Sequence, residues 1–198
     1  MKKTLEERIE KLEKQMQELA GSTGKRIRKV LGIGDTFEIL GLEWKILDIT
    51  DAGYVCLADR LEEGMQFDTN CNDWQSSNLR NYLNTEFYKK LADKIGEDNI
   101  IPFERDLLSL DGQTEYGTCE DKVSLISVDE YRKHRVLIPN TEDYTWWTLT
   151  PDSTRCNNDS RYIRVVSPSG NVSISSYYIS LGVRPFCIFS SAIFESGE

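Results

Sequence analysis

Histidine is almost absent from this chain of 198 residues, which contains only His134. Histidine is the commonest metal ligand and a frequent general base at neutral pH, so a single copy excludes a paired-histidine metal site. Motifs for a phosphate-binding loop, a dinucleotide-binding turn or a serine nucleophile elbow are also missing. We therefore expect no catalytic metal, no cofactor and no enzymatic activity.

The cysteines lack paired spacing. The five cysteines, at positions 56, 71, 119, 156 and 187, are odd in number and form no Cys-x-x-Cys motif. This pattern argues against a disulfide framework and against a zinc ribbon. It is typical of a protein made in a reducing cytoplasm.

Excess basic charge and long apolar runs are missing as well. Asp and Glu outnumber Lys and Arg by 33 to 24, which gives a net charge of -9. An acidic chain without a basic patch does not suit the phosphate backbone of nucleic acids or an anionic membrane surface. No run approaches the ~20 apolar residues of a membrane span, and the charged N-terminal sequence does not resemble a signal peptide. We expect cytoplasmic synthesis without a signal peptide, no nucleic-acid partner and no membrane insertion.

The N-terminal segment has the spacing of a coiled coil. Apolar residues alternate at intervals of four and three within residues 4 to 20, at Leu5, Ile9, Leu12, Met16 and Leu19. The sequence therefore predicts an oligomerising helix and linker over residues 1–23, followed by one domain over residues 24–198. We expect a homo-oligomer, either a dimer or a trimer. The alternative is that this helix packs on its own chain.

The first half of the domain shows strand and helix signals in turn. Alternating apolar residues between positions 37 and 58 predict a β-meander. A helix follows, capped by Asn72 or Asp73, with apolar residues at helical intervals as far as Leu91. Trp74 lies on its first turn and is expected to pin the helix to the sheet. Polar, turn-rich sequence between residues 96 and 120 predicts a long loop with room for one short strand.

The second half of the domain continues with local signals. Residues 123 to 126 form an apolar run that predicts a strand, and Ser127 with Glu130 fits a capping box for a short helix over residues 128 to 135. Two strands flanking a Ser-Pro-Ser-Gly turn at position 167 predict a hairpin, and residues 182 to 189 predict a closing strand. The fold class is α+β, with antiparallel sheets and two helices.

Polar side chains cluster around the predicted hairpin. Tyrosine supplies contact area at low entropic cost, while serine and asparagine adapt their hydrogen bonds to a ligand. Because alternate residues of a strand share a face, we expect Tyr162, Ser173 and Ser175 to point outward while Val172 and Ile174 face the core. The predicted binding residues are Asn157, Asn158, Asp159, Ser160, Tyr162, Ser173, Ser175, Tyr177 and Tyr178.

Three short motifs resemble those of known proteins. They are Trp74-x-x-Ser77-x-Leu79-Arg80, Trp147-x-x-Thr150-Pro151 and Gly182-Val183-Arg184-Pro185. In these motifs the chain resembles an uncharacterised bacterial domain family with a presumed C-type-lectin-like fold. In their order it resembles the C-type-lectin-like fold of bacterial and phage proteins, including the variable proteins of diversity-generating retroelements. The resemblance implies a C-type-lectin-like domain. It also implies that the structural residues are Trp74, Arg80, Trp147 and Arg184.

The resemblance leads to one main functional hypothesis and two alternatives. The main hypothesis is a non-enzymatic ligand- or receptor-binding protein, such as a phage tail protein, whose partner is a protein or a glycan. Formylglycine-generating enzymes share this fold and use two reactive cysteines, so Cys156 and Cys187 are the candidates for an enzymatic alternative. The other alternative is a structural virion subunit. In either phage setting the finished protein resides in the virion.

Three further features of the sequence lead to expectations. Arg184 on a buried strand needs a partner, either a carboxylate or backbone carbonyls. Adjacent residues on a strand point to opposite sides, so we expect one of Trp146 and Trp147 in the core and the other at the surface. The oxygen-rich segment 68 to 73 suits either a calcium loop or an ordinary loop that leads into a helix, because it lacks the glycine and distal glutamate of an EF-hand.

Overall fold

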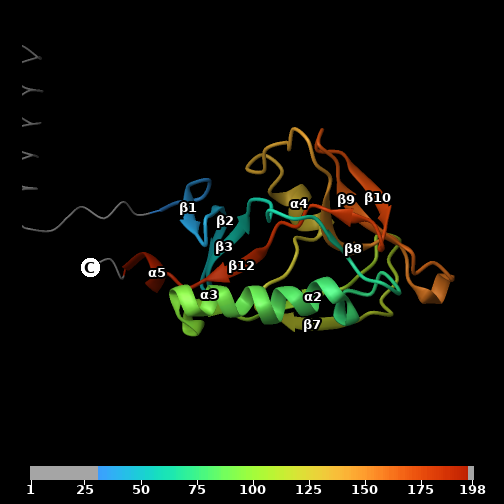
Figure 1. Cartoon of the computed structure of the whole chain (residues 1–198), viewed down its shortest axis with the longest axis horizontal. Helices are drawn as coiled ribbons and strands as arrows, with labels where there is room; N and C mark the ends of the chain where they lie inside the picture. The colour runs from blue at the N-terminus through green and yellow to red at the C-terminus, as the bar shows by residue number, and fades with distance from the viewer. Residues whose placement is uncertain (1–30, 196–198) are drawn as a thin grey trace, which may run out of the picture. The chain divides into compact units, whose positions relative to one another are not determined.

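The computed structural model describes residues 31–195 (Figure 1). From Gly32 onward these residues belong to one compact unit. The predicted helix over residues 4 to 20 and the predicted boundary after residue 23 lie outside the described residues. Within the described range, no helix is both long and apolar enough to cross a bilayer.

The larger sheet has five antiparallel strands in the order β1-β2-β3-β12-β5. Their bounds are β1 (Thr36–Ile39), β2 (Leu42–Thr50), β3 (Gly53–Ala58), β5 (Ile100–Ile101) and β12 (Phe186–Phe189). The predicted meander is confirmed as β1 to β3. The closing strand begins four residues later than predicted, after Pro185, which has no N–H to give to a ladder. It also lies inside the sheet, between β3 and β5, rather than at its edge.

The second sheet contains the predicted hairpin. Its order is β10-β9-β8, with β8 (Trp146–Pro151), β9 (Tyr162–Val166) and β10 (Val172–Ser176). The sequence prediction of a hairpin is therefore confirmed. In Figure 1, β9 and β10 lie at the opposite end of the described domain from β1 and α5 (Ala192–Glu195).

Two small ladders complete the strands. They pair β4 (Met65–Gln66) with β11 (Ser180–Leu181), and β6 (Phe103–Asp106) with β7 (Thr118–Asp121). The prediction of a long loop with one short strand over residues 96 to 120 is wrong, because β5, β6 and most of β7 fall there. Arg105 explains the error: this cation is only 5% exposed and occupies an inward position of β6, where an apolar residue would have revealed the strand.

The predicted helix after residue 72 forms as several helical turns in succession. They are η1 (Trp74–Ser76), α2 (Asn78–Tyr82), the π-helical turn η2 (Leu83–Phe87), α3 (Tyr88–Ile95) and, after Gly96, η3 (Glu97–Asn99). Asp73 caps η1 by accepting from the Gln75 amide, and Ser77 caps α2 by accepting from the Arg80 amide. The buried face carries Leu79, Leu83, Phe87 and Leu91, as the helical period predicted.

The capping box is confirmed, whereas the strand before it is not. Ser127 and Glu130 bond reciprocally to each other's backbone amides and begin α4 (Val128–Lys133), which ends two residues earlier than predicted. Residues 123 to 126 form no strand. Ser124 exchanges two backbone bonds with Phe186 of β12, and the Ile126 carbonyl accepts from the Leu149 amide, so this buried apolar run packs as an extended segment without a ladder of its own.

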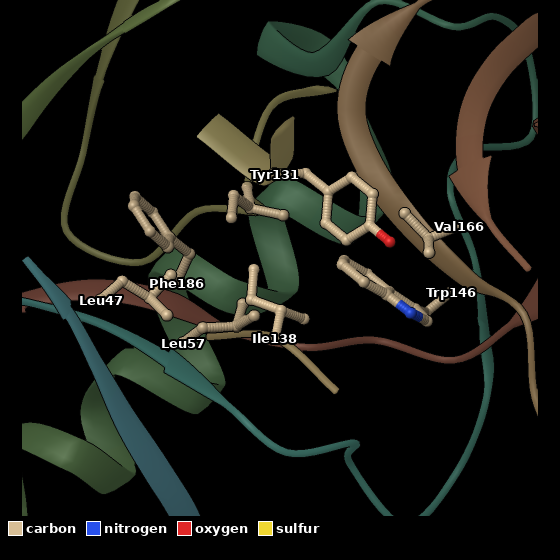
Figure 2. Packing of buried hydrophobic residues seen from close by; sticks show 8 residues of the cluster. Leu47, Leu57, Tyr131, Ile138, Trp146, Val166 and Phe186 are labelled. Atoms are coloured by element: carbon tan, nitrogen blue, oxygen red, sulfur yellow. The ribbon is translucent and has the colours of Figure 1, made fainter. Parts of the chain in front are cut away.

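The core lies between the two larger sheets and α4 (Figure 2). Trp146 packs edge-on against Tyr131 of α4, with 5.6 Å between ring centroids. Trp147 points to the other side of β8 and contacts Phe67, also at 5.6 Å. Both tryptophans are at most 1% exposed, so the prediction that one of them faces the surface is wrong. Both faces of β8 are covered by apolar residues. The alternation of side chains along a strand shows only that adjacent residues point to opposite faces, and not that both faces are buried.

Candidate binding surface

Four of the predicted binding residues lie on the loop between β8 and β9. This loop contains the short turn η4 (Arg155–Asn157). Asn157 and Asn158 are exposed, whereas Asp159 and Ser160 are half-buried. Asn158 ends the turn with a left-handed φ of 54°, a conformation that asparagine tolerates better than most residues. The two asparagine side chains are thus presented to solvent at the tip of the loop.

Arg161 organises the tyrosines next to this loop. Its guanidinium carbon lies 5.6 Å from the ring centroid of Tyr162 and 5.5 Å from that of Tyr178. Its Nη2 donates to the Tyr178 hydroxyl at 2.5 Å, and this bond to a cation lowers the pKa of Tyr178. Tyr177 packs edge-on against Tyr178 at 5.3 Å. Arg161 was missed by the sequence prediction, although it stands within the polar run between Ser160 and Tyr162.

The register of the hairpin separates residues that were predicted to share a face. Ser173 lies opposite Val165, and Ser175 lies opposite Ile163. Side chains directly opposite each other in an antiparallel pair point to the same side. The two serines therefore share a face with Ile163 and Val165, and Tyr162 lies on the other face.

Val172 and Ile174 occupy the face of Tyr162, and Ile174 is 45% exposed. Val172 packs against the core cluster, as predicted. The predictions that Ile174 faces the core and that Tyr162, Ser173 and Ser175 point outward together are wrong. The pairing between Val166 and Val172 decides the outcome, because a shift of one residue would reverse the face of every β10 side chain.

Asn72 anchors the start of β9 to the rest of the domain. Its side chain is fully buried and donates from Nδ2 to the carbonyls of Ser153 (2.9 Å) and Tyr162 (2.8 Å). Its Oδ1 accepts from the Tyr116 hydroxyl at 2.7 Å, and its own amide donates to the Ser160 carbonyl. Its amide and side-chain donors hold the β8–β9 loop and the start of β9, and its side-chain oxygen holds Tyr116. The sequence prediction treated Asn72 as a helix cap or as part of a calcium loop, and not as an anchor for β9.

Backbone bonds fix the other end of the surface. The Tyr177 carbonyl accepts from the amides of Phe67 (2.9 Å) and Asp68 (3.2 Å), and its amide donates to the Arg161 carbonyl (3.1 Å). Segment 177 to 178 is therefore tied both to the hairpin and to the loop before η1. Arg161, Tyr162 and Tyr178 lie near one another because of these bonds.

A polar cavity of about 470 Å³ lies beside the loop. Its lining residues are Leu110, Asp111, Asp152, Ser153, Asn157, Asp159 and Arg164. The Asp111 carboxylate accepts from Ser109 Oγ (2.5 Å), Ser153 Oγ (2.7 Å) and Asn157 Nδ2 (3.0 Å), and these bonds, led by that from Ser109, lower its pKa. Carboxylate groups can accept hydrogen bonds from a polar ligand, and amide groups can both accept and donate them.

Trp74 and Arg80 meet at one buried carboxylate. Asp121 of β7 accepts from Trp74 Nε1 at 2.8 Å through Oδ2, and from Arg80 Nε at 2.6 Å through Oδ1. Arg80 also donates to the carbonyls of Gln75 and Glu120. These bonds attach the start of the helical segment to β7.

Arg184 and Trp147 use backbone carbonyls. Arg184 is buried, donates from Nε to the Ala58 carbonyl at 2.9 Å, and lies 5.0 Å above the Trp146 ring. Of the two kinds of partner considered for this arginine, the carbonyl is the one observed. Trp147 donates from Nε1 to the Met65 carbonyl at 2.8 Å.

The two cysteines of the enzymatic alternative lie on different elements. Cys156 is exposed on η4, and its hydrogen bond to the Glu115 carboxylate raises the pKa of its thiol. Cys187 is buried on β12 opposite Cys56, and burial raises the pKa of Cys187 well above the usual value. A raised pKa lowers the thiolate fraction at neutral pH, and the thiolate is the nucleophilic form.

The oxygen-rich segment before η1 uses its central carboxylate internally. Asp68 Oδ2 accepts from the amides of Asn70 and Cys71, and Oδ1 accepts from the amide of Asn78. The segment thus has the bonding of a loop that leads into a helix. Across residues 31 to 195, no three His, Cys, Asp or Glu side chains are grouped as a metal site would require. His134 ends α4 as its C-cap residue.

The fold and the site together define an α+β domain of antiparallel sheets with a polar, tyrosine-containing surface at the β9–β10 end. A family model described as a domain of unknown function (DUF6273) matches residues 54–191. The chain therefore belongs to this family, and the match includes every predicted binding residue. The search of curated proteins gave no match, and the search of solved structures gave none either.

Proposed function

We propose that this protein is a non-enzymatic ligand- or receptor-binding protein. Its recognition surface consists of Asn157, Asn158, Arg161, Tyr162 and Tyr178. The observation that carries the proposal is the placement of the exposed Arg161 guanidinium against the rings of the half-buried Tyr162 and the exposed Tyr178. Tyrosine and arginine are among the residues most enriched at binding hot spots, since each combines a large contact area with directional hydrogen bonds.

The anchoring of this surface supports the proposal. The buried Asn72 side chain holds the Tyr162 carbonyl, and the Tyr177 carbonyl accepts two amides from the loop before η1. A surface held in place before binding loses less conformational entropy when the ligand arrives. Ser173 and Ser175 lie on the other face of the hairpin, so we place them outside the recognition surface. Tyr177 supports Tyr178 through ring contact.

The motif order supports a more specific setting for the same proposal. We propose a C-type-lectin-like domain, preceded by an oligomerising coiled coil over residues 4 to 20, in a phage tail or receptor-binding protein or a protein diversified by a retroelement. The partner is a protein or a glycan on another surface, and the protein acts in the virion.

Binding by variants of the full chain tests the proposal. The probes are an array of immobilised glycans and intact bacterial cells, whose surfaces carry both protein and glycan receptors. We expect the wild type to bind at least one probe and the double variant Tyr162→Ala/Tyr178→Ala to lose that binding. The thermal midpoint should change little, because both side chains are partly exposed.

Tyr88→Ala is the matched control, since Tyr88 is a half-buried tyrosine on α3, outside the recognition surface. This variant should bind as the wild type does. Wild-type protein that binds neither probe, or a folded double variant that binds normally, would contradict the proposal.

A further inference from the structure

β10 has an outer edge whose backbone groups can be assigned from the register. Two backbone bonds flank the paired part of the hairpin: the Ser167 amide donates to the Asn171 carbonyl, and the Tyr177 amide donates to the Arg161 carbonyl. They determine which residue pairs between them are hydrogen-bonded. Hydrogen-bonded and non-bonded pairs alternate along an antiparallel ladder. Ser173 and Ser175 therefore bond to β9, whereas the N–H and C=O groups of residues 172, 174 and 176 point away from it.

The opposite edge of β9 agrees with this assignment. Tyr162 and Arg164 pair with Ser176 and Ile174, and their carbonyls accept from groups outside β10: the Asp152 amide for Tyr162 and the Thr148 hydroxyl for Arg164. On β10, the Ser176 carbonyl accepts from the Ile179 amide. In the described part of the chain, the outward groups of Val172 and Ile174 have no such partner.

The other sheet edges in the described domain are short, charged or covered. β1 has four residues and carries Glu38, and β5 has two residues and is followed by Pro102. The outer edge of β8 bonds to backbone groups of Gly182 and Ile126. Natural proteins use these devices to prevent strands from pairing with other chains.

β10 has none of these protective features. Its sequence is Val-Ser-Ile-Ser-Ser, with no charge and no proline, and its pairing with β9 shows no bulge. Ile174 at its centre is 45% exposed. A regular, uncharged edge with an exposed β-branched residue is a template for another strand.

We propose that β10 pairs antiparallel with β10 of a second copy of this chain, about a two-fold axis at Ile174. The segment Ser173-Ile174-Ser175 reads the same in both directions, and the outward groups at 172, 174 and 176 are spaced symmetrically about its centre. A two-fold interface requires this self-complementarity. Ile174 then lies opposite Ile174 of the second copy, and each Ser173 lies opposite a Ser175.

The charge of the chain favours this position for self-pairing. At a net charge of -9, two copies of the chain repel each other over most of their surfaces. β10 contains no charged side chain, so two β10 strands placed side by side do not repel each other. One strand edge buries less than the roughly 1,200 Å² of a stable interface, so the pairing is weak and depends on concentration. It joins two three-stranded sheets into one continuous sheet that carries both recognition surfaces.

Residue-resolved amide hydrogen exchange on the full chain tests the proposal. The amides of Val172, Ile174 and Ser176 should exchange at least about tenfold more slowly at high than at low protein concentration. Those of Ser173 and Ser175 already bond to β9 and should not depend on concentration. A stable hairpin without pairing between copies would protect the amides of Ser173 and Ser175. It would leave those of Val172, Ile174 and Ser176 unprotected at every concentration.

Two substitutions identify the interface. Ile174→Lys adds a charge to the edge and should remove the concentration dependence, whereas Ile49→Lys, at a position 44% exposed on β2, should leave it intact. Leu12→Glu disrupts the predicted N-terminal seam and should leave slow exchange at high concentration. Equal exchange at both concentrations would overturn the proposal. So would protection that survives Ile174→Lys in a folded variant, or that disappears with Leu12→Glu alone.

Discussion

Asp121 Oδ1 lies 2.6 Å from Arg80 Nε, and the aspartate side chain of this ion pair is completely buried. The same carboxylate accepts from Trp74 Nε1 through its other oxygen. Trp74 and Arg80 belong to one sequence motif, whereas Asp121 follows Arg80 by 41 residues. One buried charge thus attaches the helical segment to β7.

Asp121→Asn should strongly destabilise the domain. The substitution keeps the side-chain shape but leaves the Arg80 guanidinium without its counter-charge, and breaking a buried ion pair typically costs about 3–5 kcal/mol. Because Arg80 is 24% exposed, we expect the lower end of that range. Urea denaturation measures the loss. The control is Asp93→Asn, which breaks the exposed pair with Lys89 and should leave the free energy of unfolding nearly unchanged. Equal losses in both variants would refute the assignment.

Glu130 should make the stability of the domain sensitive to acid. Burial alone would raise its pKa, but hydrogen bonds from Arg105, both at 2.6 Å, and the Ser127 amide outweigh burial and lower the pKa in the folded state. A carboxyl with a lower pKa in the folded state stabilises the fold above its unfolded pKa. This stabilisation is lost as pH falls through the folded pKa.

Glu130→Gln should therefore lower the free energy of unfolding near neutral pH, with a smaller difference from wild type as pH falls from about 6 to 3. Chemical denaturation across this range gives the difference at each pH. Glu104→Gln, at an exposed position on β6, is the matched control and should show no comparable trend. A constant difference between Glu130→Gln and wild type would show that the ion pair with Arg105 does not depend on this titration.

Cys156 should be the first thiol to react with a thiol reagent. The other four cysteines are buried, and Cys156 is exposed but held less reactive by the Glu115 carboxylate, which raises its pKa. Glu115→Gln should lower that pKa and increase the rate of modification below about pH 9, because more thiolate is present. Peptide mass mapping identifies the modified residue. An unchanged rate, or first modification at a buried cysteine, would contradict this account.

Residues 4 to 20 are predicted to drive self-association through the apolar seam at Leu5, Ile9, Leu12, Met16 and Leu19. At a protein concentration of a few micromolar, the weak β10 pairing contributes little, so light scattering reports on the seam. The wild type should have the mass of a dimer or a trimer, and Leu12→Glu should have the mass of a monomer. Lys14→Glu, off the seam, is the control. Monomeric wild-type protein would show that the helix does not associate.

Local features of the domain could be predicted from the sequence. The β-meander, the hairpin around Ser-Pro-Ser-Gly, the helix with Leu79 to Leu91 and the capping box of Ser127 and Glu130 each depend on residues a few positions apart. Alternation, helical period and capping arise from hydrogen bonds and burial within one element, and these are encoded locally. For the same reason the polar loop and tyrosines near the hairpin could be recognised as candidate binding residues.

Tertiary structure decided which of those residues share a surface. The register between Val166 and Val172 places Ser173 and Ser175 on the face away from Tyr162, and the backbone bonds of Tyr177 bring Tyr178 to Arg161. Asn72 gained its anchoring role from partners that follow it by as many as 90 residues.

The partners of buried charges were also decided at long range. Arg105 occupies a core position because Glu130 neutralises it, and Arg184 is held by the Ala58 carbonyl across a separation of 126 residues. A buried polar group must find a partner wherever the folded chain supplies one. The side chain shows that a partner is needed, but only the packing of distant segments determines which group it is.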